Sequence, residues 1–301
     1  MANSFLASAN ATIELLESFG LHTKKGFGQH FLVDDNIVGK ILDLAEVSSD
    51  DTILEVGPGI GTLTVGLLAR GARVIAIEKD TDLLQILDAT CPRATDSIAE
   101  SFALLNMDAL DLEPAHLQVV ADGFPSATLP GKFVANLPYA VAATIVLDFF
   151  QRLDCIEMAC VMVQSEVAQR MCASPGSKDY GAYTIKIGLL ANPISGFPVK
   201  PGCFLPPPRV DSRVIRLDRR TDIASRELVD AACMMADAAF FQRRKTIRNS
   251  IGSFLGSRGL GSAPLDDILS AAGIDPKSRG EAHPIESYLE LGRAFLEFAS
   301  E

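Results

Sequence analysis

The sequence predicts an α/β fold with a doubly wound, mostly parallel sheet, followed by a small all-helical domain. From Asp51 onward, short β-rich runs alternate with runs of helical periodicity, and this alternation implies parallel pairing of the strands. After about Thr221 the strand patterns stop and only helical periodicity continues. The composition, with 48% hydrophobic and 22% charged residues, is that of a folded globular protein. We therefore expect two domains, 1–220 and 221–301.

The elements of the first domain follow one another at short intervals. Apolar runs predict strands at 51–57, 72–80, 101–110, 131–139 and 156–164. Helical spacing predicts helices at 61–71, 81–90 and 140–150, and Asp80 or Thr81 can cap the second of these. Segment 192–212 is rich in proline and glycine, which predicts loops around an extended pair. In the second domain we expect helices at 224–241, 263–273 and 285–299.

Several classes of protein are disfavoured by simple sequence features. No apolar run reaches the roughly 18 residues of a membrane span, and the N-terminus lacks the pattern of a signal peptide, so we expect a cytoplasmic protein. The six cysteines form no C-x-x-C pair, which favours reduced thiols. The four histidines are scattered, so we expect no metal site. Nothing in the sequence indicates an obligate protein partner.

The charge distribution leaves two interpretations open. A net charge of −11 argues against a polyanionic partner, because proteins that bind nucleic acids usually present a basic surface. However, two local strips are basic, namely "RVDSRVIRLDRR" at 209–220 and "QRRKTIR" at 242–248. From charge alone, each strip can be a contact face or solvated surface.

A glycine turn follows the first predicted strand and precedes a helix. "LEVGPGIGTL" contains Gly57, Gly59 and Gly61, and such a turn lets the backbone approach a ligand closely. A dinucleotide fingerprint would have glycine at position 62, where this chain has Thr62, so the match to that motif is imperfect.

Acidic residues follow the next two strands. Glu78 ends the second strand, where its carboxylate can accept hydrogen bonds from ribose hydroxyls, and Asp108 follows the third, where it can face an adenine amine. Either acid alone could be a surface residue or a helix cap. Together with the glycine turn they suit the adenosine half of a cofactor and resemble class I S-adenosylmethionine-dependent methyltransferases. At this step a pyridine-nucleotide dehydrogenase stays possible.

The fourth strand ends in an unusual sequence, Asn136-Leu137-Pro138-Tyr139. Asn136 offers a carbonyl acceptor, Pro138 stiffens the turn, and Tyr139 offers a flat apolar face, which together suit a planar amine such as the exocyclic nitrogen of adenine. That nitrogen is a poor nucleophile, and acceptors that bind its two hydrogens localise its lone pair. Catalysis then depends on alignment and desolvation, and the base must be flipped out or already unpaired. The alternative is a conventional turn with its tyrosine packed in the core.

Four segments carry a resemblance to the ribosomal RNA adenine dimethyltransferases. "NLPY" is similar to the (D/N)PP(Y/F) motif of amino-methyltransferases, and "KKGFGQHFLVDDNIV", "FLPPPRVDSRVIRL" and "FFQRRKTIRNSI" resemble other segments of the family. The resemblance extends from about Lys24 to the C-terminal helices. It implies dimethylation of the N6 amines of two adjacent adenines near the 3′ end of 16S rRNA. The partner would be the small ribosomal subunit or its precursor, whose maturation the enzyme would assist, and the cofactor would be S-adenosylmethionine, converted to S-adenosylhomocysteine.

The resemblance also implies roles for matching positions. His30, Leu32 and Gly59 would belong to the cofactor site, and Gly57 would lie under the methionine part. Glu78 would hold the ribose, Asp108 the adenine, and Asn136 would serve both cofactor and target. The catalytic turn would be Asn136, Leu137, Pro138 and Tyr139. The rings that stack on the target base would be Tyr139 and Phe204. The residues that contact RNA phosphates would be Arg243, Arg244, Lys245 and Arg248.

Three other functions stay open at the sequence level. A large-subunit adenine methyltransferase of the antibiotic-resistance type shares the glycine turn and an Asn-x-Pro-aromatic motif. A non-catalytic ribosome-assembly factor could keep the fold, although the intact Asn136, Pro138 and Tyr139 argue against loss of chemistry. A nicotinamide oxidoreductase has different glycine spacing and a hydride-transfer acid that this sequence lacks.

Overall fold

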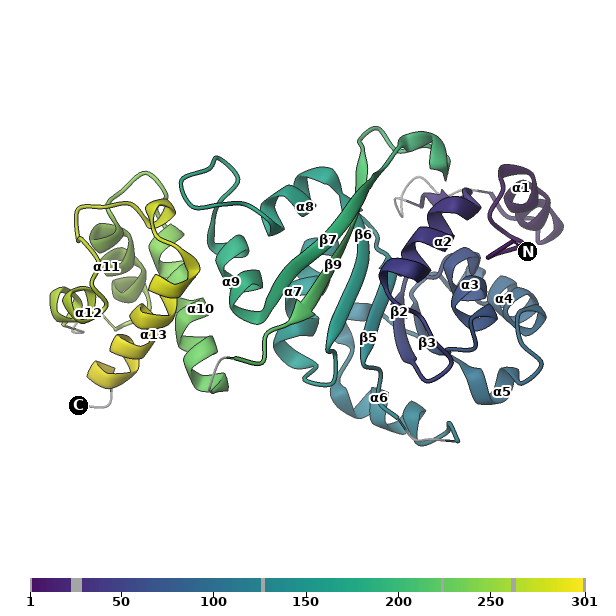
Figure 1. Cartoon of the computed structure of the whole chain (residues 1–301), viewed down its shortest axis with the longest axis horizontal. Helices are drawn as coiled ribbons and strands as arrows, with labels where there is room; N and C mark the ends of the chain where they lie inside the picture. Colours follow the sequence, from purple (N-terminus) through teal and green to yellow (C-terminus); the bar gives the residue numbers. More distant parts are fainter. Residues whose placement is uncertain (1, 23–28, 126–127, 223–224, 261–263, 300–301) are drawn as a thin grey trace. The chain divides into compact units, whose positions relative to one another are not determined.

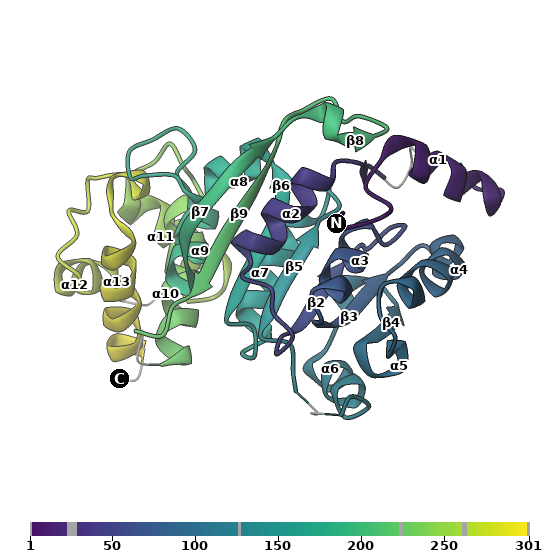
Figure 2. The same cartoon turned by 45° about the vertical axis from the view of Figure 1, so that its right-hand side comes forward.

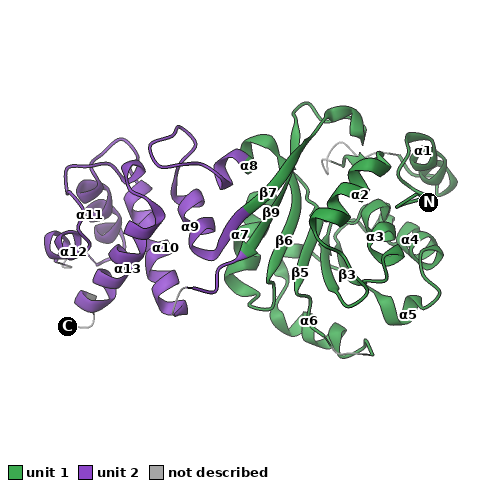
Figure 3. Cartoon of the chain, viewed as in Figure 1, with its two compact units in different colours: residues 1–168, 194–218 green, residues 169–193, 219–301 purple. Residues whose placement is uncertain are grey.

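The computed structural model describes residues 2–22, 29–125, 128–222, 225–260 and 264–299. The chain divides into two compact units, shown in Figure 3. Unit 1 comprises Met1–Ala168 and Ile194–Asp218, and unit 2 comprises Gln169–Pro193 and Arg219–Glu301. The expected domain boundary at 220/221 stays a prediction.

Seven strands form the main sheet, in the order β4–β3–β2–β5–β6–β9–β7 (Figure 1). The pairs β2/β3, β3/β4, β2/β5 and β5/β6 are parallel, and β6/β9 is antiparallel. The chain order reverses between β2 and β5, which is the point where open α/β sheets bind ligands at the carboxyl ends of their strands. The strands are β2 Thr52–Val56, β3 Arg73–Glu78, β4 Phe102–Asn106, β5 Lys132–Asn136, β6 Met158–Gln164, β7 Ala191–Val199 and β9 Ser212–Arg219.

Helices occupy the segments between these strands. Asp80 is the N-cap of α4, where its side chain accepts a hydrogen bond from the Asp82 backbone N–H, one of the two caps expected from the sequence. Periodicity identified α3, α4 and α7, whereas it left the short or amphipathic helices α1, α2, α5, α6 and α8 unassigned. The helices are α1 Ala9–Ser18, α2 Asp35–Leu44, α3 Thr62–Ala69, α4 Thr81–Thr90, α5 Ile98–Ser101, α6 Pro114–Ala121, α7 Ala142–Arg152 and α8 Ser165–Met171.

Apolar side chains cover both faces of the sheet, as the doubly wound prediction requires. On one face, Val134 of β5 joins a buried cluster with apolar residues of α2, α3 and α4. Successive strand residues point to opposite faces, so Phe133 lies on the other side. There its ring packs against that of Phe149 in α7, with centroids 5.0 Å apart. This fully buried sheet fixes the strand ends that carry the site.

A second, two-stranded sheet was not expected from the sequence. Strand β1, Phe31–Leu32, pairs antiparallel with β8, Phe204–Leu205. In Figure 2 the green segment that connects β7 and β9 runs to α1 and α2, and this segment carries β8. The pairing brings residues 29–32 beside the proline-rich segment and holds both next to the ends of the main strands.

Unit 2 is mainly helical. Its longest helices, α10 and α13, approach closely, because a Cβ added at Gly292 would lie 2.7 Å from the backbone nitrogen of Ala232. Helix α11 was not predicted, since its first turn belongs to the basic strip at 242–248. Within the described residues, no helix is long and apolar enough to cross a membrane. The helices are α9 Ala182–Leu190, α10 Arg226–Phe240, α11 Ile247–Ser257, α12 Leu265–Ala271 and α13 Ile285–Ala299.

Candidate active site

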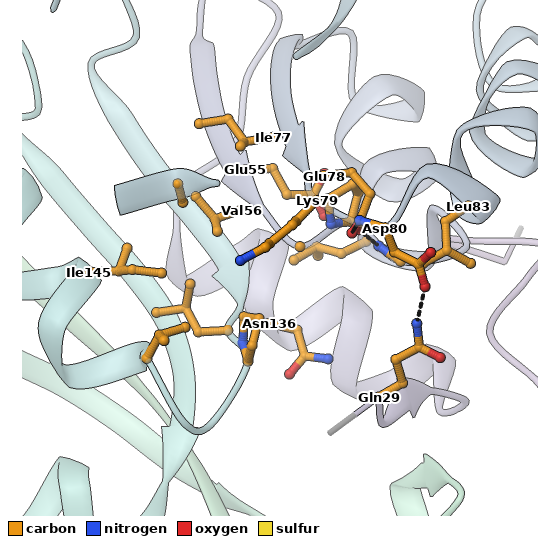
Figure 4. A pocket seen from close by; sticks show the side chains of 18 of the residues that line it. Gln29, Glu55, Val56, Ile77, Glu78, Lys79, Asp80, Leu83, Asn136 and Ile145 are labelled. Atoms are coloured by element: carbon orange, nitrogen blue, oxygen red, sulfur yellow. Dashed lines mark hydrogen bonds between the residues drawn. The ribbon is translucent and has the colours of Figure 1, made fainter. Parts of the chain in front are cut away.

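A cavity of about 310 Å³ lies at the carboxyl ends of β2, β3 and β5 in unit 1. Side chains from these strand ends surround it, as Figure 4 shows for Glu55, Glu78 and Asn136. The structure brings most residues of the predicted site into its lining. They are His30, Leu32, Gly57, Gly59, Glu78, Asp108, Asn136, Leu137, Pro138 and Tyr139.

The glycine turn after β2 forms one wall of the cavity. Gly57 and Gly59 have φ angles of 69° and 62°, a left-handed conformation that favours glycine. A Cβ on Gly57 would lie 3.3 Å from the ring of Pro138, and one on Gly59 would lie 3.1 Å from the ring of Phe31. The turn is therefore in close contact with both the Asn136–Tyr139 segment and β1.

Glu78, at the end of β3, is only 7% exposed and faces the glycine turn. Its two carboxylate oxygens accept hydrogen bonds from the backbone N–H groups of Asp80, at 2.8 Å, and Gly59, at 3.2 Å. Burial raises the pKa of Glu78, and these N–H donors oppose that shift. The backbone bonds fix the carboxylate in place while leaving further lone pairs to accept ligand hydroxyls.

Asp108 follows β4 and lies on the cavity lining beside Lys79. The Lys79 Nζ atom is 2.6 Å from Asp108 Oδ2, and the Leu110 backbone N–H donates to Asp108 Oδ1. These two donors lower the pKa of Asp108, so its carboxylate stays ionised at neutral pH. An ionised acceptor at this position can bind an amine of a ligand.

Asn136 is oriented by a single hydrogen bond. Its side-chain amide nitrogen lies 3.3 Å from the backbone carbonyl oxygen of His30. A carbonyl oxygen only accepts, so the atom facing it is the NH₂ group, and Oδ1 is the acceptor left on this side chain. No hydrogen bond to Oδ1 is formed within the described parts of the chain. The next residue, Leu137, donates its N–H to Met162 O at 3.1 Å, which ties the turn to β6.

Tyr139 lies between two groups from distant parts of the sequence. The His30 ring stacks on it, with centroids 5.5 Å apart and planes inclined by 29°. Its hydroxyl group shares a short hydrogen bond with the Ser212 hydroxyl. The Nδ1 of His30 is 2.8 Å from Pro206 O and carries the hydrogen, because a carbonyl cannot donate. Burial raises the pKa of Tyr139, so the phenol stays neutral.

Three buried polar groups under the glycine turn were not predicted. Glu55 Oε2, Thr62 Oγ1 and Thr64 Oγ1 have no hydrogen-bond partner, and Glu55 and Thr62 line the cavity. Orphaned acceptors and donors beside a left-handed glycine turn fit a polar ligand such as S-adenosylmethionine better than an apolar one. The available signal was a carboxylate inside the apolar run "TILEV".

The structure does not bring Phe204 into the cavity lining. Its backbone pairs with Leu32 across the two-stranded sheet, and its side chain is 3% exposed within the same apolar cluster as Val134. The expected role of Phe204 as the second stacking ring stays a prediction, and in this structure the side chain is packed in the core. Residues 23–28 of the "KKGFGQHF" motif lie outside the described part of the chain.

The predicted phosphate-binding residues lie in unit 2, in the turn between α10 and α11 and in the first turn of α11. Arg243 pairs with Glu281 at 3.1 Å, and Arg248 pairs with Asp266 at 2.5 Å. Arg244 and Lys245 are exposed, and neither side chain has a hydrogen bond or ion pair with the residues that the structure describes. Two of the four expected phosphate-binding residues thus form ion pairs with acids of the same chain. Nowhere in the described ranges do three or more His, Cys, Asp or Glu side chains gather to hold a metal ion.

The fold and the groups at its strand ends are those of the class I S-adenosylmethionine-dependent methyltransferases. A mostly parallel sheet carries a glycine turn after β2, acids after β3 and β4, and the Asn136–Tyr139 turn after β5. A family model described as "Ribosomal RNA adenine dimethylase" matches residues 20–291. The chain belongs to this family, whose members are rRNA adenine dimethyltransferases.

Known relatives are similar over nearly the full chain. A ribosomal RNA small subunit methyltransferase A from Streptomyces griseus is 39% identical over 291 residues, covering 95% of this chain and 94% of its own length. A protein of the same name from Phenylobacterium zucineum is 39% identical over 285 residues, with 94% and 92% covered.

Two solved structures show the same fold. A dimethyladenosine transferase from Plasmodium falciparum superposes with a TM-score of 0.70 at 24% identity, covering 90% of this chain and 98% of that one. The 23S rRNA methyltransferase ErmE superposes with a TM-score of 0.60 at 24% identity, covering 88% and 99%. At this level of identity the likeness concerns the fold alone.

Proposed function

We propose that this protein dimethylates the N6 amines of two adjacent adenines near the 3′ end of 16S rRNA, with S-adenosylmethionine as methyl donor. The substrate would be the small ribosomal subunit or its precursor, so the enzyme would act in the cytoplasm during subunit maturation, with no obligate protein partner. The relatives that are 37–39% identical over more than 90% of this chain carry a small-subunit name, which supports this choice of substrate.

One observation carries the proposed chemistry. The Asn136 amide donates to His30 O, so its Oδ1 is left as an acceptor in the lining of the cavity that also contains Gly57 and Glu78. The adenine nitrogen would donate to Oδ1 and to the backbone carbonyl before Pro138. Two such acceptors favour a pyramidal nitrogen whose lone pair is localised for attack. The turn is held by the Leu137 bond to β6, so the acceptors need little reorganisation.

The other lining residues bind and orient. S-adenosylmethionine, when bound, supplies an electrophilic methyl group on its sulfonium. In this proposal His30 and Leu32 line its site, Gly57 and Gly59 lie against its methionine part, and Glu78 accepts from its ribose. Asp108 accepts from its adenine, and Tyr139 stacks on the target base. The neutral phenol of Tyr139 leaves the stacking face uncharged, and the methylated amine gives its proton to water.

The decisive experiment measures transfer of labelled methyl groups to under-methylated small subunits, followed by mapping of the modified bases. We expect dimethyladenine at two adjacent positions near the 3′ end. Label in large-subunit RNA would favour the resistance-type enzyme, and tight particle binding without label would favour an assembly factor. Calorimetry with S-adenosylmethionine and with nicotinamide nucleotides distinguishes a methyltransferase, which binds the first, from an oxidoreductase, which binds the second.

Asn136→Ala tests the role of the amide. We expect it to abolish measurable transfer while particle binding stays within about twofold, because the lost interaction is made to the reacting amine. Asn249→Ala, which removes an exposed amide in α11, is the matched control and should keep full activity. Substantial turnover by Asn136→Ala would contradict the mechanism.

We further propose that Arg243, Arg244, Lys245 and Arg248 contact rRNA phosphates. Exposed ion pairs contribute only about 0–1 kcal/mol, so Arg243 and Arg248 can exchange their acids for phosphates at low cost. Removing all four charges should weaken particle binding and reduce the slope of log K against log salt by roughly 3. An unchanged slope would show that these residues do not bind RNA.

A further inference from the structure

The segment between β8 and β9 is hydrogen-bonded to two residues that line the cavity, and it carries charge that the proposed reaction does not use. We call residues Pro206–Ser212 the rim loop. Its first residue accepts a hydrogen bond from His30 Nδ1 at 2.8 Å, and its last residue bonds the Tyr139 hydroxyl. His30 and Tyr139 both line the cavity and stack on each other. Both ends of the rim loop are therefore fastened to the cavity wall.

The middle of the rim loop cannot be far from these anchors. Arg209 is three residues from Pro206 and three from Ser212, so its Cα lies within about 11 Å of the Cα of each anchor. Arg209 is exposed, and Val210 beside it is 45% exposed although it is apolar. An exposed charged side chain and an exposed apolar side chain are thus neighbours in the sequence, close to two residues of the cavity wall.

In the first basic strip, the side chains of Arg209 and Arg213 form no ion pair with the described residues, and of these two only Arg209 lies in the rim loop and is exposed. Arg216 is 2.7 Å from Glu46 and 2.8 Å from Asp218, and Arg220 is 2.7 Å from Asp222. The acid of the rim loop, Asp211, is itself paired with Lys200 at 3.3 Å. Arg209, in contrast, has no hydrogen bond or ion pair with any residue in the described parts of the chain.

A strand that delivers a base beside His30 and Tyr139 would pass close to the rim loop, whose ends contact both residues. Its target base leaves the stack, so the adjacent base loses a stacking partner and exposes an apolar face, while its phosphates stay charged. An unpaired guanidinium can bind a phosphate through two parallel hydrogen bonds, and an apolar side chain can cover the exposed base. Arg209 and Val210 supply these two groups side by side.

We propose that the rim loop recognises the nucleotide next to the target adenine, with Arg209 binding its phosphate and Val210 packing on its base. This inference rests on the proposed rRNA methyl transfer. It assigns substrate binding to a loop that contributes no group to the cofactor site, so its loss should affect the RNA and leave the cofactor unchanged.

The test compares Arg209→Ala with Arg70→Ala in single-turnover methyl transfer to under-methylated small subunits at several salt concentrations. Arg70 is a matched control because it is a partly exposed arginine of unit 1, paired with Asp43 and absent from the cavity lining. We expect Arg209→Ala to raise the half-saturating particle concentration about tenfold and to reduce the salt slope by about 0.7, the value for one single-strand phosphate. The saturating rate and the cofactor affinity should stay within about twofold of wild type.

Val210→Ser tests the second contact. We expect it to lower the saturating rate about fivefold without changing the salt slope, because the lost contact is uncharged. Equal behaviour of Arg209→Ala and Arg70→Ala would overturn the phosphate contact, and wild-type rates in Val210→Ser would overturn the base contact. Absence of label with the wild-type enzyme would instead refute the proposed function itself, which keeps the two failures distinct.

Discussion

Glu55 is a carboxyl group that the fold holds in its neutral form. It lies in β2, is 1% exposed, and its Oε2 has no partner. Burial raises its pKa from 4.5 to about 8; the nearby Thr64 hydroxyl opposes this shift, and the charge of Glu78 adds a smaller increase. At pH 7 the folded protein therefore contains a protonated Glu55, which a glutamine can replace at nearly the same volume. Glu55→Gln should remove the ionisation of this group and little else.

The raised pKa fixes the sign and size of a pH effect on stability. The folded state binds the proton of Glu55 more tightly than the unfolded state, so this proton stabilises the fold. Its contribution to the free energy of unfolding is complete below about pH 4.5 and is lost as pH rises through 8. Each pKa unit corresponds to about 1.4 kcal/mol, so the wild type should lose roughly 4 kcal/mol between pH 5 and pH 9. Glu55→Gln should lack this loss, and its advantage over wild type should grow with pH.

The assay must report on unit 1 alone, and buried cysteines provide the probe. The chain has no tryptophan, but Cys91 and Cys160 are buried in unit 1 and Cys233 is buried in unit 2. Thiol labelling in increasing urea, read by mass spectrometry of each cysteine peptide, gives the free energy of unfolding of each unit. Glu55→Gln should shift the Cys91 and Cys160 midpoints at pH 9 and leave Cys233 unchanged. Parallel pH profiles for Glu55→Gln and wild type at Cys91 and Cys160 would refute the reasoning.

Three further results are expected in the same cavity. Gly57→Ala should destabilise the protein by about 1–2 kcal/mol, because alanine disfavours the left-handed backbone at this position and its Cβ would press on the ring of Pro138. Thermal unfolding with and without S-adenosylmethionine measures this loss. Tyr139→Phe and Ser212→Ala should each lower the free energy of unfolding by about 1 kcal/mol. The double variant should lose little more, because both substitutions remove the same hydrogen bond; additive losses in urea unfolding would contradict that. Asp108→Asn should weaken cofactor binding about tenfold by calorimetry, whereas Lys79→Met should change it less than about threefold, because their ion pair is exposed.

The sequence predicted those parts of the site that follow from local order along the chain. Strand ends in a parallel sheet meet at one edge, so Gly57, Glu78, Asp108 and Asn136 could be placed together before any coordinates were known. The two-stranded sheet could not be foreseen, because Phe31–Leu32 and Phe204–Leu205 are each two residues long and carry no periodicity.

That unforeseen pairing explains why Phe204 lies outside the cavity lining. Phe204 follows a proline-rich segment and looks free to stack on a ligand, but its pairing with Leu32 turns its side chain into the core. The same pairing brings the His30 ring and carbonyl to Tyr139 and Asn136. A contact between residues more than 170 positions apart is set by tertiary packing, which sequence periodicity does not encode.

The internal ion pairs bear on how a chain with a net charge of −11 would interact with RNA. Arg216, Arg220, Arg243 and Arg248 are matched by acids of the same chain, so part of each basic strip is neutralised toward an approaching polyanion. An evenly basic surface would bind any RNA and discriminate poorly, because phosphate contacts carry no sequence information. In the proposed binding mode, Arg209 of the rim loop binds the phosphate next to the target when the target base enters the cavity. On this reasoning the acidic surface favours selectivity for the correct strand geometry at the expense of affinity for RNA in general.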